Sequence, residues 1–222
     1  MLRQLRGKAS GRKLRLFACA CCRMAWHLLE FRNSRRGVEA AERWLELEPP
    51  RSRDEDNAFS VGAYGALSGW RHQRDWWRKS AETAAASGAA YCCVLDAWQA
   101  ARFACDDSST ALAREVATTA RTRVARKAAL ASAARFARER FACLLRDLFV
   151  IRPSAPRCPP RPSGAVLLAQ AIYDERAFDR LPILADTLAS AGCAAPDILA
   201  HLRSPGPHVR GCWAVDLVLG KG

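Results

Sequence analysis

The chain has 222 residues, a length that suits one domain or two small ones and is ample for a buried apolar core. Hydrophobic residues make up 50% and charged residues 26%, a composition that excludes a disordered or fibrous protein. The formal net charge is +13, yet 30 of the 35 basic residues are Arg, which reflects a GC-rich coding sequence as much as selection for an anionic partner. No apolar run approaches the ~18–20 residues of a membrane helix, and ten Cys are too few for a disulfide scaffold. We therefore expect a cytoplasmic protein with free thiols and no membrane partner.

The basic residues gather in two segments. Residues 1–36 hold ten Lys and Arg against one acid, and residues 114–161 hold twelve against three acids. Residues 37–60 are acidic, and three of their carboxylates line one face of a predicted helix: Glu39, Glu42 and Glu46. We expect the basic N-terminal helix to dock on this acidic helix, which would neutralise part of the charge.

Helical periodicity dominates the first 150 residues. Ser10 is expected to cap the first helix. Its apolar face recurs at alternating spacings of three and four: Leu14, Phe17, Cys21, Met24, Leu28 and Phe31. Further helices are expected at 34–48, 70–86 and 89–105, with Pro49-Pro50 ending the first of these and a break at residues 106–109. An Ala/Arg-rich pattern from there to Val150 predicts one bent helix or two.

Five prolines within residues 151–164 exclude a regular helix there. We therefore expect three parts: an N-terminal helical domain at 1–150, a proline-rich linker at 151–164 and a smaller C-terminal helical unit at 165–222. In the last part the pattern predicts helices starting near Val166, at 181–191 before Gly192, at 196–202 and at 209–219. The last segment also permits a strand, because its apolar residues alternate. The predicted fold class is mostly α, a helical array followed by the smaller unit.

Two long blocks resemble a multi-copy family of bacterial proteins to which no activity is assigned. The first is LRGKASGRKLRLFACACCRMAWHLL at residues 5–29. The second covers residues 166–222 and runs from VLLAQAIYDERAFDRLPILADTLASAGC to HVRGCWAVDLVLGKG. After LLRDLF the family carries a GNPFRP-like segment, where this chain has VIRPSAPRCPPRPSG. The resemblance implies a bacterial, cytoplasmic origin and no particular substrate.

Cysteine and histidine residues suggest a zinc site. Cys19 and Cys22 form a C-x-x-C on one face of a helix and would share an ion, with further ligands in the last thirty residues. The candidate set is Cys19, Cys22, Cys193, His208 and Cys212, with His201 as a further ligand. The alternative is that these thiols fill apolar space as small hydrophobic residues, as we expect for the adjacent Cys92 and Cys93.

A second hypothesis is binding of nucleic acid. Indoles and cations interleave in one stretch, a pattern typical of single-strand binding through stacking and phosphate contacts. The candidate residues are Trp70, Arg71, Arg74, Trp76, Trp77, Arg78 and Lys79. A phosphate-facing side would be added by a second basic set: Arg121, Arg123, Arg126, Lys127, Arg135, Arg138 and Arg140. The alternative is that the tryptophans belong to the core and the arginines to a solvated face.

Motifs of catalysis are missing from the sequence. It contains no H-E-x-x-H, no phosphate-binding glycine-lysine loop, no G-x-S-x-G and no G-x-G-x-x-G. Cys212 with His208 would make a nucleophile and base, but no third group to orient them is apparent. The sequence therefore favours a non-enzymatic interaction or regulatory module that binds a protein partner or itself. Nucleic-acid binding and metal binding are the two alternatives.

Overall fold

The computed structural model describes residues 2–47, 80–93, 96–149 and 161–221. In these residues the chain forms helices and turns without a strand, so the predicted mostly α fold class is confirmed. The chain divides into two compact units, Met1–Ala142 and Cys143–Gly222. The division falls within a helix, whereas the sequence predicted it in the segment 151–164, most of which lies outside the described residues. No helix of the described part is long and apolar enough to cross a membrane.

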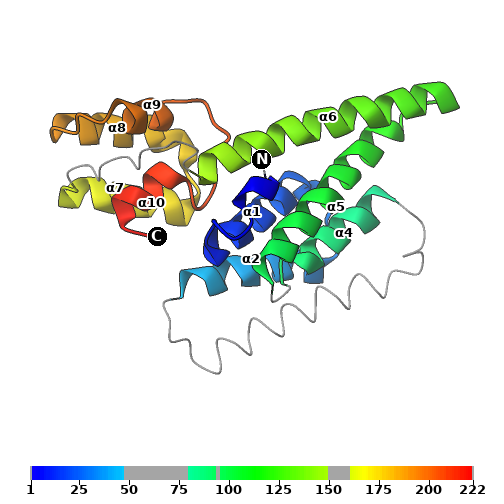
Figure 1. The fold of residues 1–222 in the computed structure, drawn as a ribbon, viewed down its shortest axis with the longest axis horizontal. Coiled ribbons are helices and arrows are strands. Elements are labelled where there is room, and N and C mark those ends of the chain that lie inside the picture. Colours follow the sequence, from blue (N-terminus) through cyan, green and yellow to red (C-terminus); the bar gives the residue numbers. More distant parts are fainter. Residues whose placement is uncertain (1, 48–79, 94–95, 150–160, 222) are drawn as a thin grey trace. The chain divides into compact units, whose positions relative to one another are not determined.

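Unit 1 is an array of packed helices (Figure 1). Its described elements are η1 (Leu2–Leu5), α1 (Gly11–Met24), η2 (Trp26–Leu28), α2 (Arg32–Glu46), α4 (Ala81–Tyr91), α5 (Ala97–Ala117) and the greater part of α6 (Arg123–Leu148). Ser10 caps α1 as predicted, because its hydroxyl accepts a hydrogen bond from the Lys13 amide at 3.3 Å. The helix is shorter than predicted: it ends at Met24, and the apolar face continues through η2, where Leu28 is buried.

The predicted docking of the basic helix on the acidic helix is confirmed between α1 and α2. Arg23 donates two hydrogen bonds to Glu42, from Nε to Oε1 at 3.1 Å and from Nη2 to Oε2 at 2.7 Å. Its guanidinium also lies 3.8 Å from the centroid of the Trp26 ring. A second contact joins Arg12 Nη2 to Glu46 Oε1 at 3.9 Å. Part of the N-terminal positive charge is therefore neutralised within the unit.

Helices α4 and α5 lie side by side and run through both positions where the sequence predicted breaks (Figure 1). Ser87 Oγ donates a hydrogen bond to Asp107 Oδ2 at 2.6 Å. A Cβ atom on Gly88 would lie 3.3 Å from Ser108 Oγ, so the missing side chain lets the helices approach closely. The polar and small residues that resemble helix breakers are thus the packing surface between these helices, and the predicted bounds 89–105 are wrong. The start predicted at Trp70 lies outside the described residues.

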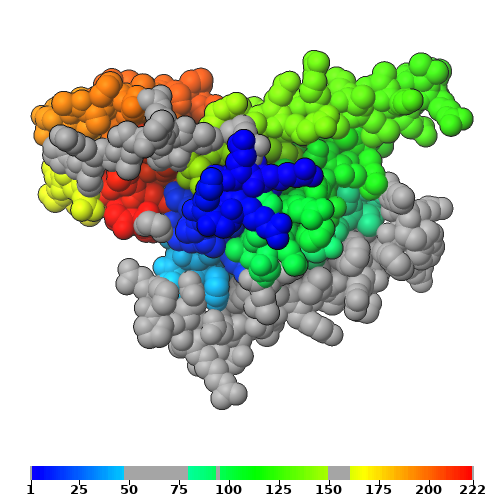
Figure 2. Space-filling view, viewed as in Figure 1, coloured from blue at the N-terminus to red at the C-terminus, as the bar shows by residue number. Residues whose placement is uncertain are grey.

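The Ala/Arg-rich segment forms two helices, because α5 ends at Ala117 and α6 begins at Arg123. Much of the first half of α6 is exposed on the surface, where it appears in green (Figure 2). Its exposed apolar side chains include Val124 at 81% and Phe136 at 61%. The exposed cations of α6 are Arg123, Arg126, Lys127, Arg135, Arg138, Arg140 and Arg146. These residues match the solvated face that the sequence analysis kept as an alternative.

Unit 2 contains the last turn of α6 and a group of short helices. These are α7 (Ser163–Glu175), η3 (Phe178–Arg180), α8 (Leu181–Ser190), α9 (Pro196–Leu202) and α10 (Trp213–Leu219). Gly192 ends α8 at a φ of +86°, and Pro196 begins α9, as predicted. The strand alternative for the last segment is wrong, because α10 buries Val215 and Val218, three residues apart, on one helix face. α7 begins at Ser163, inside the predicted linker.

Candidate metal centre

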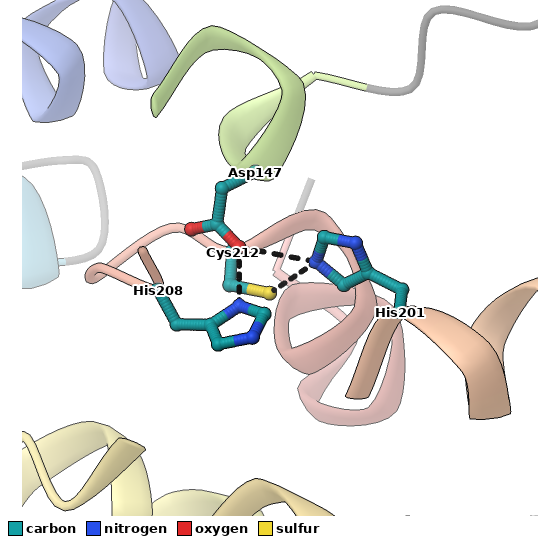
Figure 3. Close-up of side chains that lie close together, drawn as sticks. All are labelled: Asp147, His201, His208 and Cys212. Atoms are coloured by element: carbon teal, nitrogen blue, oxygen red, sulfur yellow. Dashed lines mark hydrogen bonds and ion pairs between the residues drawn. The ribbon is translucent and has the colours of Figure 1, made fainter. Parts of the chain in front are cut away.

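Four side chains of unit 2 converge on one point (Figure 3). They are Asp147, His201, His208 and Cys212, and we refer to them as the Asp147 cluster. Each offers one potential ligand atom, and these four atoms all lie within 4.8 Å of one another. Among the described residues this is the group of three or more His, Cys, Asp or Glu side chains with the geometry to hold a metal ion.

Each member of the cluster comes from a different local structure. Asp147 lies in the last turn of α6, His201 in the last turn of α9, His208 in the following loop, and Cys212 at the N-cap of α10. The side chains of Asp147 and His208 are 3% and 5% exposed, that of His201 is 18% exposed, and Cys212 is fully buried. Turns and helix ends therefore bring together groups that are costly to bury unless they are paired.

One carboxylate oxygen is the centre of the contacts. Asp147 Oδ1 lies 2.7 Å from His208 Nδ1 and 3.0 Å from His201 Nε2. The same His201 nitrogen lies 3.2 Å from Cys212 Sγ. The other oxygen, Oδ2, accepts a hydrogen bond from the Val209 amide at 2.9 Å. The Val209 amide thus orients the carboxylate so that Oδ1 faces the two imidazoles.

The orientation of His208 is set by the loop in which it lies. Its Nε2 lies 3.0 Å from the Ser204 carbonyl oxygen, which can only accept, so Nε2 carries a proton and Nδ1 faces the cluster. Gly206 makes room for this arrangement. It has a φ of +86°, and a Cβ atom there would lie 2.8 Å from the His208 amide nitrogen. A carbonyl partner of this kind is typical of histidines that bind metals.

Protonation in the cluster follows from burial and pairing. Burial disfavours the charged form of Asp147, but hydrogen bonds from His201, His208 and Val209 outweigh it and lower the pKa of its carboxyl. Burial likewise opposes the charged form of His208, and the contact with Asp147 outweighs it and raises the pKa of the imidazole. Burial and the adjacent carboxylate raise the pKa of the Cys212 thiol well above its ordinary value.

The sequence-based candidate set is divided between the two units. His208 and Cys212 lie in the cluster, together with His201, while Cys193 lies in the apolar core of unit 2. Cys19 and Cys22 are buried in the core of unit 1, where Cys22 Sγ lies 3.3 Å from Cys92 Sγ. Cys92 and Cys93 are buried in that core too, as expected of packing residues.

Asp147 was missed by the sequence analysis. It stands in the segment Leu144-Leu145-Arg146-Asp147-Leu148, whose three leucines are buried in the structure. A carboxylate among such leucines is a signal in itself, because a buried acid requires a partner. Its partners lie 54 and 61 residues further along the chain, so no local spacing identifies them.

The predicted nucleic-acid site, residues 70–79, lies outside the described residues. Three other tryptophans of unit 1 can be located. Trp98 lies beneath the guanidinium of Arg6, and Trp44 beneath that of Arg15. Arg23 and Arg35 both lie over Trp26. These indoles therefore contact the protein's own arginines.

Comparison with family models, with curated proteins and with solved structures gives no match to this chain. The geometry and chemistry of the Asp147 cluster are thus the basis on which a function can be inferred.

Proposed function

We propose that the chain is a non-enzymatic metal-binding module whose Asp147 cluster holds one zinc ion. The observation that carries the proposal is the convergence of one carboxylate, two imidazoles and one thiol within 4.8 Å at a buried point. These are the ligand types that zinc takes in proteins, and four of them complete its preferred tetrahedral shell.

The distances suit a small adjustment around an ion. With zinc bonds of the usual length, neighbouring ligand atoms lie about 3.3–3.6 Å apart. The three contacts within the cluster measure 2.7, 3.0 and 3.2 Å. These contacts would widen by less than 1 Å, and the remaining pairs, which lie within 4.8 Å, would have to shorten to reach this range. Asp147 Oδ1, His201 Nε2, His208 Nδ1 and Cys212 Sγ would be the ligands.

The protonation of the four groups is compatible with zinc. In the metal-free arrangement Asp147 Oδ1 is contacted by both imidazoles, and His201 Nε2 also lies 3.2 Å from Cys212 Sγ. A zinc ion would replace these contacts, because it takes the electron pairs of all four ligand atoms and displaces the thiol proton.

A cysteine nucleophile fits the geometry less well. In a nucleophile–base–acid relay the histidine uses one ring nitrogen for the nucleophile and the other for the carboxylate. Here the same nitrogen of His201 faces both Asp147 and Cys212. Cys212 is also fully buried, and its raised pKa keeps it as a thiol. Four protein ligands leave no open position for substrate, which is typical of a structural zinc site.

The competing interpretation is a buried ion pair between Asp147 and a protonated His208, which requires no metal. The two interpretations differ in metal content. We expect protein purified under reducing conditions to bind one equivalent of zinc and, after stripping, one equivalent of cobalt(II). Cobalt bound through Cys212 should give a thiolate-to-metal charge-transfer band together with the intense visible bands of a tetrahedral site.

Two cysteine variants make the test specific. Cys212→Ser should lose the charge-transfer band and weaken zinc binding at least about tenfold in a chelator competition. Cys193→Ser is the matched control, because it removes another buried thiol of unit 2 that lies outside the cluster. Absence of stoichiometric zinc or cobalt uptake, or equal effects of the two variants, would contradict the proposal.

A further inference from the structure

The last turn of α6 carries buried leucines, Leu144, Leu145 and Leu148, and also makes polar contacts with the rest of unit 2. The described apolar core of this unit draws on residues 165–218, from α7 to α10. No residue of 143–149 belongs to that core as the structure describes it. The contacts that reach this turn from elsewhere in the unit include those of Asp147 with His201, His208 and the Val209 amide.

The partner segment depends on the cluster as well. Between the end of α9 and the start of α10 the chain forms no helix, and two of the four members, His208 and Cys212, lie in this stretch. Its backbone bonds are local, such as those from the Ser204 amide to the His201 carbonyl and from the Cys212 amide to the Val209 carbonyl. Arg210 ties the segment to α7 by donating to the Tyr173 and Asp174 carbonyls at 3.2 and 2.9 Å. The side chains of the Asp147 cluster are what connects the segment to the last turn of α6.

We infer that the ion is a clasp: its occupancy determines whether the last turn of α6 is held against the 201–212 segment. This inference rests on the proposed function. We take the ion to bind only when all four ligands meet. The ratio of closed to open protein then rises in proportion to the free ion concentration divided by the dissociation constant, once that concentration is well above the constant. Removing it leaves the carboxylate with hydrogen bonds alone, and the two segments can separate.

The effect should remain local. The core of α7 to α10 is apolar and fully buried at Leu184, Ile198, Leu202 and Val215, and none of these side chains requires an ion. Hydrophobic burial of this kind persists when a polar contact is lost. The clasp therefore predicts that the α7–α8 helices keep their order in the metal-free protein.

Hydrogen exchange measured by mass spectrometry on the full chain tests this. Zinc-loaded and chelator-stripped protein are compared, with zinc at 100 times its dissociation constant. The amides of 143–149 and 203–212 should exchange up to about 100 times faster when stripped, whereas those of α7 and α8 stay unchanged. Asp147→Asn should exchange fast at 143–149 even with zinc present, and Asp179→Asn, an exposed acid of the same unit, should behave as wild type.

The outcomes separate the two proposals. Uptake of one zinc with unchanged exchange at 143–149 would refute the clasp and leave the metal site standing. Faster exchange spread equally over α7 and α8 would also refute the clasp, because zinc would then stabilise the whole unit. Failure to take up zinc refutes the proposed function itself. This outcome is measured by the metal content of the protein and does not depend on the hydrogen-exchange result.

Discussion

Asp147 Oδ1 lies 2.7 Å from His208 Nδ1, although 61 residues separate the two in the chain. This contact joins the end of α6 to the loop that precedes α10. Each partner favours the charged form of the other, which lowers the pKa of Asp147 and raises that of His208. In the absence of metal the two residues form a buried ion pair, and this pair stabilises the protein only over a defined range of pH.

The first prediction is that the Asp147–His208 pair contributes most to the stability of the metal-free protein between the ordinary pKa values of the two groups, 3.8 and 6.5. The contribution of Asp147 is present above its ordinary pKa and is lost as the pH falls through its lowered folded value. The contribution of His208 is present below 6.5 and is lost as the pH rises through its raised folded value. Urea unfolding at a series of pH values measures how the free energy of unfolding falls on the acid side and on the alkaline side. His208→Gln should remove most of the fall on the alkaline side. If this fall is unchanged in the variant, it belongs to another group.

A second prediction concerns Gly206, whose missing side chain makes room for His208. Gly206→Ala should lower the free energy of unfolding by about 1–3 kcal/mol, because it combines a positive φ with a clash 2.8 Å from the His208 amide. It should also weaken zinc binding. Gly192→Ala is the matched control, since Gly192 has the same φ of +86° and open space around it. Its cost should be smaller and zinc binding unchanged; equal costs would show that the clash is unimportant.

The third prediction tests the close approach of α4 and α5. Gly88→Leu should destabilise unit 1 by about 1–3 kcal/mol, because even a Cβ atom would lie 3.3 Å from Ser108 Oγ and 3.4 Å from Asp107 Cβ. Gly164→Leu, in the first turn of α7 with nothing within 4 Å of its Cβ position, should be neutral or stabilising by up to ~1 kcal/mol. Thermal unfolding compares the two. A neutral Gly88→Leu would mean that the helices can separate without cost.

A fourth prediction concerns thiol reactivity. Burial, followed by the hydrogen bond with Cys105, raises the pKa of Cys21 well above its ordinary value, so this thiol should resist alkylation in the folded protein. Cys143 is only half-buried and should react faster than Cys21. Iodoacetamide labelling followed by peptide mapping gives the order. Labelling of Cys21 as fast as Cys143 would indicate that the core of unit 1 opens readily.

Local signals in the sequence were sufficient for much of the fold. Ser10, Gly192 and Pro196 each act within a few residues, and the structure has them where the pattern predicted. The errors arose where tertiary packing overrides local preference. Ser87-Gly88 and the segment 106–109 resemble helix breaks, but across the α4–α5 interface they pair with each other, and pairing between distant segments is not visible in a periodicity.

The candidate site was predicted in part. The clustering of Cys and His near the C-terminus suggested His208 and Cys212, whose spacing is local. The equally suggestive spacing of Cys19 and Cys22 belongs to the core of unit 1, where thiols serve as small apolar residues. Asp147 could be predicted only by knowing which distant loop faces the end of α6. The packing of unit 2 determines this, and no short motif in the sequence indicates it.

The forked contact between Arg23 and Glu42 has a consequence for how α1 and α2 are aligned. Two parallel hydrogen bonds between a planar guanidinium and a planar carboxylate allow only one mutual rotation of the two side chains. The contact therefore favours one alignment of the two side chains as well as joining the helices. A lysine at position 23 would keep the attraction and lose this alignment, since an ammonium group has no plane to match.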